Sequence, residues 1–149
     1  MTAWPGLRIE CVLAPCAPPR YIAAMPSLFL VMIGGAAGAG LRWEFGRLAM
    51  ARLGPGFPWG TLAVNLIGGL LMGVLAGAMT GADHADRPLW LLLAVGLLGG
   101  FTTFSAFSLD LFAMLERGRL GTASLYVAAS VAGSLLLLAA GWWTARLAA

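Results

Sequence analysis

Four long apolar runs, separated by short segments rich in glycine, proline and charge, dominate this chain of 149 residues. The runs cover roughly residues 28–49, 59–79, 89–115 and 120–143. A helix needs about 20 predominantly apolar residues to cross a bilayer, and each run is long enough. We therefore predict an all-α membrane protein with four transmembrane helices and no separate soluble domain.

The composition agrees with this prediction and excludes several classes of protein. Charged residues make up 10% of the chain, whereas soluble domains carry about 25%. The net charge of +3 comes from scattered arginines without any lysine, so no nucleic-acid partner is expected. Cys11 and Cys16 match no metal-binding spacing and are interpreted as incidental.

The first 24 residues differ from the rest of the chain. They contain four prolines and no apolar run of signal-peptide type. We expect residues 1–24 to be a disordered tail, or to precede the real start of the protein at Met25. The four-span domain would then occupy residues 25–149.

The third apolar run contains the most informative segment. Residues 99–107 read Gly-Gly-Phe-Thr-Thr-Phe-Ser-Ala-Phe, and two adjacent glycines weaken a helix. Broken backbone at membrane depth is tolerated only where it is buried in protein or lines a cavity. We predict a broken third helix, with carbonyls freed between Gly99 and Thr102 that can hold a sodium ion.

Polar and aromatic side chains near this break predict an ion path. Asn65 lies about 9 Å inside the second run and carries two amide donors, although it could also simply join two helices. Phe104 and Phe107 share a helix face, either as core residues or as rings whose positive edges face an anion. Thr103 and Ser105 add hydroxyl donors beside them.

A further set of hydroxyl groups lies in one stripe along the fourth run, at Tyr126, Ser130 and Ser134. Serine in a span often bonds to its own helix, which is the alternative interpretation. Arg42, late in the first run, could pair with Glu44 or Asp110, extend to the interface, or attract anions into a vestibule. These alternatives stay open at this point.

Three motifs occur in order along the chain. Residues 34–42 read Gly-Gly-Ala-Ala-Gly-Ala-Gly-Leu-Arg, residues 60–68 read Gly-Thr-Leu-Ala-Val-Asn-Leu-Ile-Gly, and residues 99–107 form the broken segment. With these motifs the chain resembles the CrcB/Fluc family of fluoride channels from residue 28 to about residue 147. It departs from the family at Ala106, where a threonine is frequent, and in its N-terminal tail.

The resemblance implies an antiparallel, dual-topology homodimer in the cell inner membrane. It would contain two pores, each built from both subunits, and would export fluoride passively from the cytoplasm. Phe104 and Phe107 would present ring edges to fluoride, Asn65 would donate to it, and a polar track would comprise Tyr126, Ser130 and Ser134. The backbone carbonyls of Gly99 and Thr102 would hold a structural sodium ion that is not transported.

The arginine balance allows dual topology. Alternate sides of the membrane would hold Arg8, Arg20, Arg87 and Arg146 against Arg47, Arg52, Arg117 and Arg119. This is four against four, or two against four if the chain begins at Met25. Such a balance gives only a weak orienting signal.

Other functions are less favoured by the residues. A small multidrug transporter needs a carboxylate near the membrane centre, but Glu44 and Asp110 lie toward the ends of their runs. A passive structural subunit would not need the polar groups. No enzyme is expected, because His84 is the only histidine and lies in a connecting segment without a nucleophile motif.

Overall fold

The computed structural model describes residues 25–79 and 87–148, and all described elements are helical. The expectations for residues 1–24 and for His84 lie outside these residues. The elements in chain order are α1 (Met25–Leu53), α2 (Trp59–Ala78), α3 (Pro88–Trp90), the π-helix η3 (Leu91–Leu98), α4 (Gly99–Phe101), α5 (Phe104–Glu116) and α6 (Leu120–Ala148).

Four helical segments are long and apolar enough to cross a membrane: Ser27–Leu53, Trp59–Ala78, Pro88–Glu116 and Leu120–Ala148. They confirm the predicted number of spans and place most boundaries within a few residues of the expected ones. The fourth span extends farther than predicted, to Ala148. The chain is therefore a multi-pass membrane protein of the all-α class.

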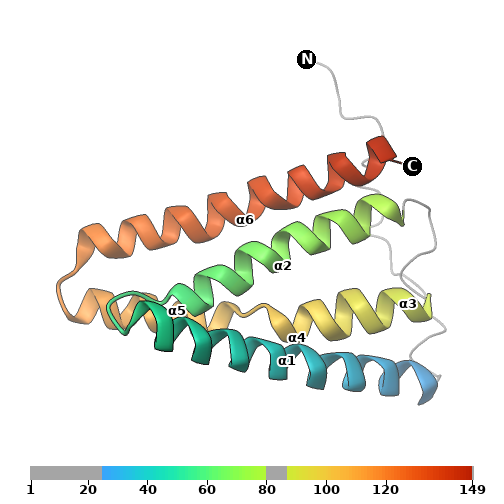
Figure 1. Cartoon of the computed structure of the whole chain (residues 1–149), viewed down its shortest axis with the longest axis horizontal. Helices are drawn as coiled ribbons and strands as arrows, with labels where there is room; N and C mark the ends of the chain where they lie inside the picture. The colour runs from blue at the N-terminus through green and yellow to red at the C-terminus, as the bar shows by residue number, and fades with distance from the viewer. Residues whose placement is uncertain (1–24, 80–86, 149) are drawn as a thin grey trace, which may run out of the picture.

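The four spans lie side by side along one long axis (Figure 1). The α1–α2 turn and the α5–α6 turn lie at the same end of the molecule, where Arg119 donates a 3.1 Å hydrogen bond to the carbonyl of Gly56. Gly54 and Gly118 follow the ends of α1 and α5 with φ of 76° and 68°. Glycine takes this left-handed conformation at the least steric cost, which fits the two sharp reversals.

Glycines bring α2 and α6 into direct backbone contact. A side chain at Gly69 would meet the Ser134 carbonyl oxygen at 2.8 Å, and one at Gly73 would overlap the carbonyl oxygen of Leu138. This is the close packing that small residues at four-residue spacing allow between membrane helices. The four-residue spacing of Gly69, Gly73 and Gly77 therefore serves helix packing within one subunit.

A second glycine contact fixes the third span against α1. Gly96 packs on Gly34, and Gly100 packs on Gly35, so closely that a Cβ atom at either Gly96 or Gly100 would meet α1 backbone at 3.0 Å or less. The glycines of the first and third motifs thus hold the broken span at a fixed position. This contact places the break beside α1.

The helix break itself lies slightly later than the sequence indicated. Gly99 to Phe101 continue the helix as α4, and only Thr102 and Thr103 are extended. The glycine pair was the wrong marker because Gly100 is needed for its contact with Gly35. The predicted broken third span is nevertheless confirmed.

Candidate functional site

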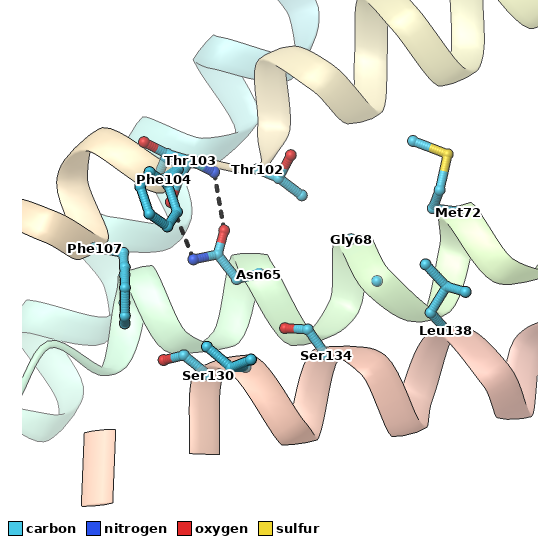
Figure 2. A pocket seen from close by; sticks show the side chains of 12 residues that line it. Asn65, Gly68, Met72, Thr102, Thr103, Phe104, Phe107, Ser130, Ser134 and Leu138 are labelled. Atoms are coloured by element: carbon cyan, nitrogen blue, oxygen red, sulfur yellow. Dashed lines mark hydrogen bonds between the residues drawn. The ribbon is translucent and has the colours of Figure 1, made fainter. Parts of the chain in front are cut away.

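The break is held open by a side chain from α2. The Asn65 Oδ1 accepts a hydrogen bond from the Thr103 N–H at 2.9 Å, and its Nδ2 donates to the Thr103 carbonyl at 3.1 Å (Figure 2). The Thr103 hydroxyl accepts from the Ala106 N–H at 3.2 Å and so caps the start of α5. Together these bonds replace the helical partners that the break removes.

Two carbonyls at the break lose their helical donors. In a continuous helix the N–H groups of Thr103 and Ala106 would donate to the carbonyls of Gly99 and Thr102, four residues earlier. Here both N–H groups donate to side-chain oxygens. The Thr102 carbonyl instead accepts from Arg42 at 3.4 Å. Carbonyl oxygens released in this way are suited to a hard cation such as sodium.

A cavity of about 340 Å³ lies along the break. It is bounded by α2, the extended segment, the start of α5, and α6 (Figure 2). The polar residues on its wall are Asn65, Thr102, Thr103, Ser130 and Ser134, and the remaining wall is formed by Gly68, Gly69, Met72, Phe104, Phe107, Val131 and Leu138. Seven of the predicted site residues therefore meet in one cavity: Asn65, Thr102, Thr103, Phe104, Phe107, Ser130 and Ser134.

The two phenylalanines form an asymmetric pair at this cavity. Their ring centroids are 5.6 Å apart with the planes tilted by 39°. Phe107 is 7% exposed, whereas Phe104 is 78% exposed. The cavity thus opens to the surface of the subunit past Phe104, with one ring fixed in the core and the other projecting outward.

The cavity also contains hydrogen-bond donors without a partner in the described chain. Ser130 Oγ is buried and makes no hydrogen bond. Asn65 uses one amide hydrogen on Thr103, and its second has no acceptor among the described residues. An unpaired hydroxyl of this kind needs an explanation, because buried polar groups in proteins are nearly always bonded. A small anion accepting from these donors would supply it.

Tyr126 lies behind Phe107 rather than on the cavity wall. Its ring is fully buried, with its centroid 5.1 Å from that of Phe107. Its hydroxyl donates to the Asp110 carboxylate at 3.3 Å, and Thr61 donates to the same oxygen at 2.8 Å. The stripe predicted from the sequence is therefore divided, since Ser130 and Ser134 face the cavity while Tyr126 is bound to a carboxylate.

Thr61 and Asp110 were not among the predicted site residues. The sequence indicates Asp110 only as a partner for Arg42 or as a proton-exchanging carboxylate, and Thr61 only as part of the second motif. The two residues are 49 positions apart, so no local spacing rule pairs them. A carboxylate in an apolar run was the one available signal.

The remaining predicted residues lie at the edges of the site. Arg42 is half-buried and contacts Thr102, whereas Glu44 pairs with Arg47. An Arg42–Glu44 pair was a wrong alternative, because residues two apart do not share a helix face. Ser105 is exposed, with its Oγ 3.2 Å from that of Thr103.

Comparison with known proteins places this site in a family. Residues 29–142 match the family model described as "CrcB-like protein, Camphor Resistance (CrcB)". The chain belongs to the CrcB family. All residues of the 340 Å³ cavity lie within the matched segment of this family member.

Several relatives of this CrcB protein carry the name "Fluoride-specific ion channel FluC". One from Sphingopyxis alaskensis is 51% identical over 117 residues, covering 78% of this chain and 93% of the relative. One from Chelativorans sp. is 52% identical over 122 residues, covering 82% and 98%. One from Novosphingobium aromaticivorans is 54% identical over 111 residues, covering 72% and 86%.

Proposed function

We propose that this chain is a passive fluoride channel that lets fluoride leave the cytoplasm through the inner membrane. The observation that carries the proposal is the cavity beside the helix break, where Asn65 and Ser130 have donors without partners among the described residues and Phe107 contributes an aromatic ring. The identity of the ion as fluoride is inferred from the names of the relatives.

The chemistry of the cavity favours a small anion. Its wall has amide and hydroxyl donors but neither an arginine nor an acid. Donors of this kind can replace part of the hydration shell of fluoride, and phenyl ring edges carry partial positive charge. Because no full positive charge faces the ion, it is not trapped in the pathway.

The arrangement of acids favours passive transport over proton exchange. Glu44 is paired with Arg47, and the Asp110 carboxylate accepts from Thr61 and Tyr126. The carboxylates of Glu44 and Asp110, both in membrane-spanning helices, are therefore already bonded to other side chains. A transporter that exchanges protons for a cation would need an embedded carboxylate open to its substrate.

The exposed wall of the cavity supports a dimer with two shared pores. Polar groups facing lipid are costly, yet the cavity opens past Phe104, which is 78% exposed. A second copy in the opposite orientation would cover this opening and add its own residues. The balanced arginines agree with such dual insertion.

A structural sodium ion at the dimer centre would fit the break. The carbonyls of Gly99 and Thr102 have lost their helical donors, and Gly99 lies on the subunit surface, where a second copy can approach. The Thr102 carbonyl accepts a 3.4 Å bond from Arg42, so the Arg42 guanidinium would have to turn away for this carbonyl to bind the ion. Backbone carbonyls at a helix break are suitable ligands for sodium. The ion would remain bound and would not be transported.

The proposal is tested with purified protein in liposomes loaded with fluoride or chloride. We expect rapid fluoride efflux that needs no proton gradient, and little chloride efflux. Equal efflux of the two halides, or efflux that stops when the proton gradient is collapsed, would contradict the proposal.

A further inference from the structure

A single glycine of α2, Gly68, lies directly against the extended segment of the third span (Figure 2). It is buried, and a Cβ atom at this position would come within 2.1 Å of the Thr102 Cγ2 methyl. Ordinary van der Waals contact begins at 3.4 Å, so even the smallest side chain would displace this methyl. The missing side chain of Gly68 therefore leaves a socket, meaning the space against α2 that the Thr102 methyl fills.

Gly68 is separate from the glycines that pack α2 on α6. Cβ atoms at Gly69, Gly73 and Gly77 would each meet a backbone oxygen of α6 at 2.8 Å or less. At Gly68, by contrast, the three nearest atoms all belong to side chains of the third span. The absence of a side chain at Gly68 is therefore required by the break and not by the packing of α2 on α6.

Thr102 is held on two sides. Its hydroxyl donates to the Leu98 carbonyl at 2.8 Å, and its N–H donates to the same carbonyl at 2.9 Å, while its methyl contacts Gly68. The next residue, Thr103, is bonded to Asn65, which shares a face of α2 with Gly68 because the two are three residues apart. One face of α2 thus fits both extended residues, one by hydrogen bonds and the other by shape.

We propose that Gly68 is a positioning residue, which fixes the depth of Thr102 against α2 and therefore the place where the Thr102 carbonyl meets the sodium ion. This inference rests on the proposed channel and its structural sodium. Gly68 has no side chain to bind an ion, and it acts through the Thr102 methyl, because a displaced residue carries its own carbonyl with it. A side chain at position 68 should therefore weaken sodium binding, and fluoride conduction with it.

The test exchanges methyl groups across this contact. Gly68→Ala adds a methyl where the Thr102 methyl lies, and adding Thr102→Ser removes the older methyl but keeps the hydroxyl that bonds to Leu98. Without Cγ2, the nearest atoms to the new methyl are the Cβ of residue 102 at 3.6 Å and a Phe101 ring carbon at 3.7 Å, which are ordinary contacts. The clash is therefore present in the single variant and absent from the double variant.

Thermal unfolding in detergent is measured over a range of sodium concentrations, with a large organic cation keeping the ionic strength constant. Fluoride efflux from liposomes is measured in parallel. For Gly68→Ala, the sodium concentration that gives half of the full stabilisation should rise at least about tenfold, and efflux should fall at least about tenfold, because overpacking shifts the backbone. Gly68→Ala/Thr102→Ser should recover most of both losses.

Gly77→Ala is the matched control on the same helix. Its methyl would meet the Trp142 carbonyl oxygen of α6 at 2.6 Å, and Gly77 is not on the wall of the cavity at the break. This variant should lose thermal stability at every sodium concentration, while the sodium concentration for half stabilisation stays at the wild-type value. Adding Thr102→Ser to Gly77→Ala should restore nothing, because the two residues are not in contact.

The outcomes separate this inference from the channel proposal. Wild-type protein that is stabilised by sodium but releases no fluoride contradicts the channel, while the sodium concentrations for half stabilisation still test Gly68. The inference is overturned if sodium does not stabilise wild-type protein, if Gly68→Ala responds to sodium as Gly77→Ala does, or if Thr102→Ser fails to restore the response. Should Gly68→Ala alone not fold, a folded double variant that responds to sodium supports the inference, and an unfolded double variant overturns it.

Discussion

Replacing Asn65 by leucine tests whether this side chain both holds the break and serves the ion. Leucine has nearly the same size and shape as asparagine but no polar atoms, so packing is kept while both bonds to Thr103 are lost. The Thr103 N–H and carbonyl would then be without their partners inside the protein. The same substitution removes the free amide hydrogen from the cavity.

The structure gives a separate magnitude for each role. Hydrogen bonds between membrane helices average about 0.6 kcal/mol and reach about 1.7 kcal/mol, so two of them stabilise the folded state by about 1–3 kcal/mol. A hydrogen bond to a charged group contributes about 1.5–3 kcal/mol, which corresponds to a loss of about 10- to 100-fold in fluoride flux. The stability loss is therefore modest, whereas the flux loss is large.

Both quantities can be measured on the same preparation. Thermal unfolding in detergent reports on the clamp, meaning the two hydrogen bonds between Asn65 and Thr103. Fluoride efflux from liposomes reports on the remaining amide hydrogen of Asn65 as a donor to the ion. Ile67→Leu, two residues along α2 and outside the cavity wall, is the matched control and should leave efflux unchanged and stability nearly so.

Each failure has its own meaning for Asn65. If efflux stays at the wild-type value while stability falls, Asn65 only joins α2 to the break and donates nothing to the ion. If efflux falls while stability is unchanged, the two bonds to Thr103 do not hold the break. Wild-type values for both would refute the whole argument.

Three further changes should give measurable results. Phe107→Ile should reduce fluoride efflux at least about tenfold while the fold survives, because the ring edge is lost but apolar volume remains; unchanged efflux would make Phe107 a core residue only. Replacing sodium by a large organic cation should lower both efflux and thermal stability, since the proposed ligands are carbonyls at the break; indifference of both measurements would argue against the site. Gly73→Ala should lower thermal stability by about 1–3 kcal/mol, because its methyl group would overlap the Leu138 carbonyl. Gly121→Ala, which meets nothing within 4 Å, should not.

The spans and their packing could be predicted from sequence because each depends on local composition. Apolar length alone predicts the four helices. The four-residue spacing of Gly69 and Gly73 indicates close contact with another helix, but only the structure shows that this helix is α6. The Arg47–Glu44 pair was also within reach, since residues three apart share a helix face. The same rule excludes Arg42 as a partner for Glu44, because residues two apart do not share a helix face.

The position of the break and the division of the hydroxyl stripe depend on distant contacts. The glycine pair at 99–100 looked like the weakest point, but Gly100 is helical and packs against α1. A local signal did exist, because threonine is a favoured helix N-cap and Thr103 caps α5. No such signal separates Tyr126 from Ser130, since a carboxylate 16 positions before Tyr126 determines where its hydroxyl points.

The position of the break also explains how the aromatic pair is aimed. In an unbroken helix, the directions of Phe104 and Phe107 would be fixed by the contact of Gly96 and Gly100 with α1. Because Thr102 and Thr103 are extended, the direction of α5 is no longer fixed by the helix before it. The Thr103 cap and the two bonds from Asn65 orient α5 instead. The same clamp leaves Phe107 in the core and Phe104 exposed. In the proposed channel Asn65 would therefore act on the ion twice, through the amide hydrogen that has no acceptor among the described residues and through the placement of both rings.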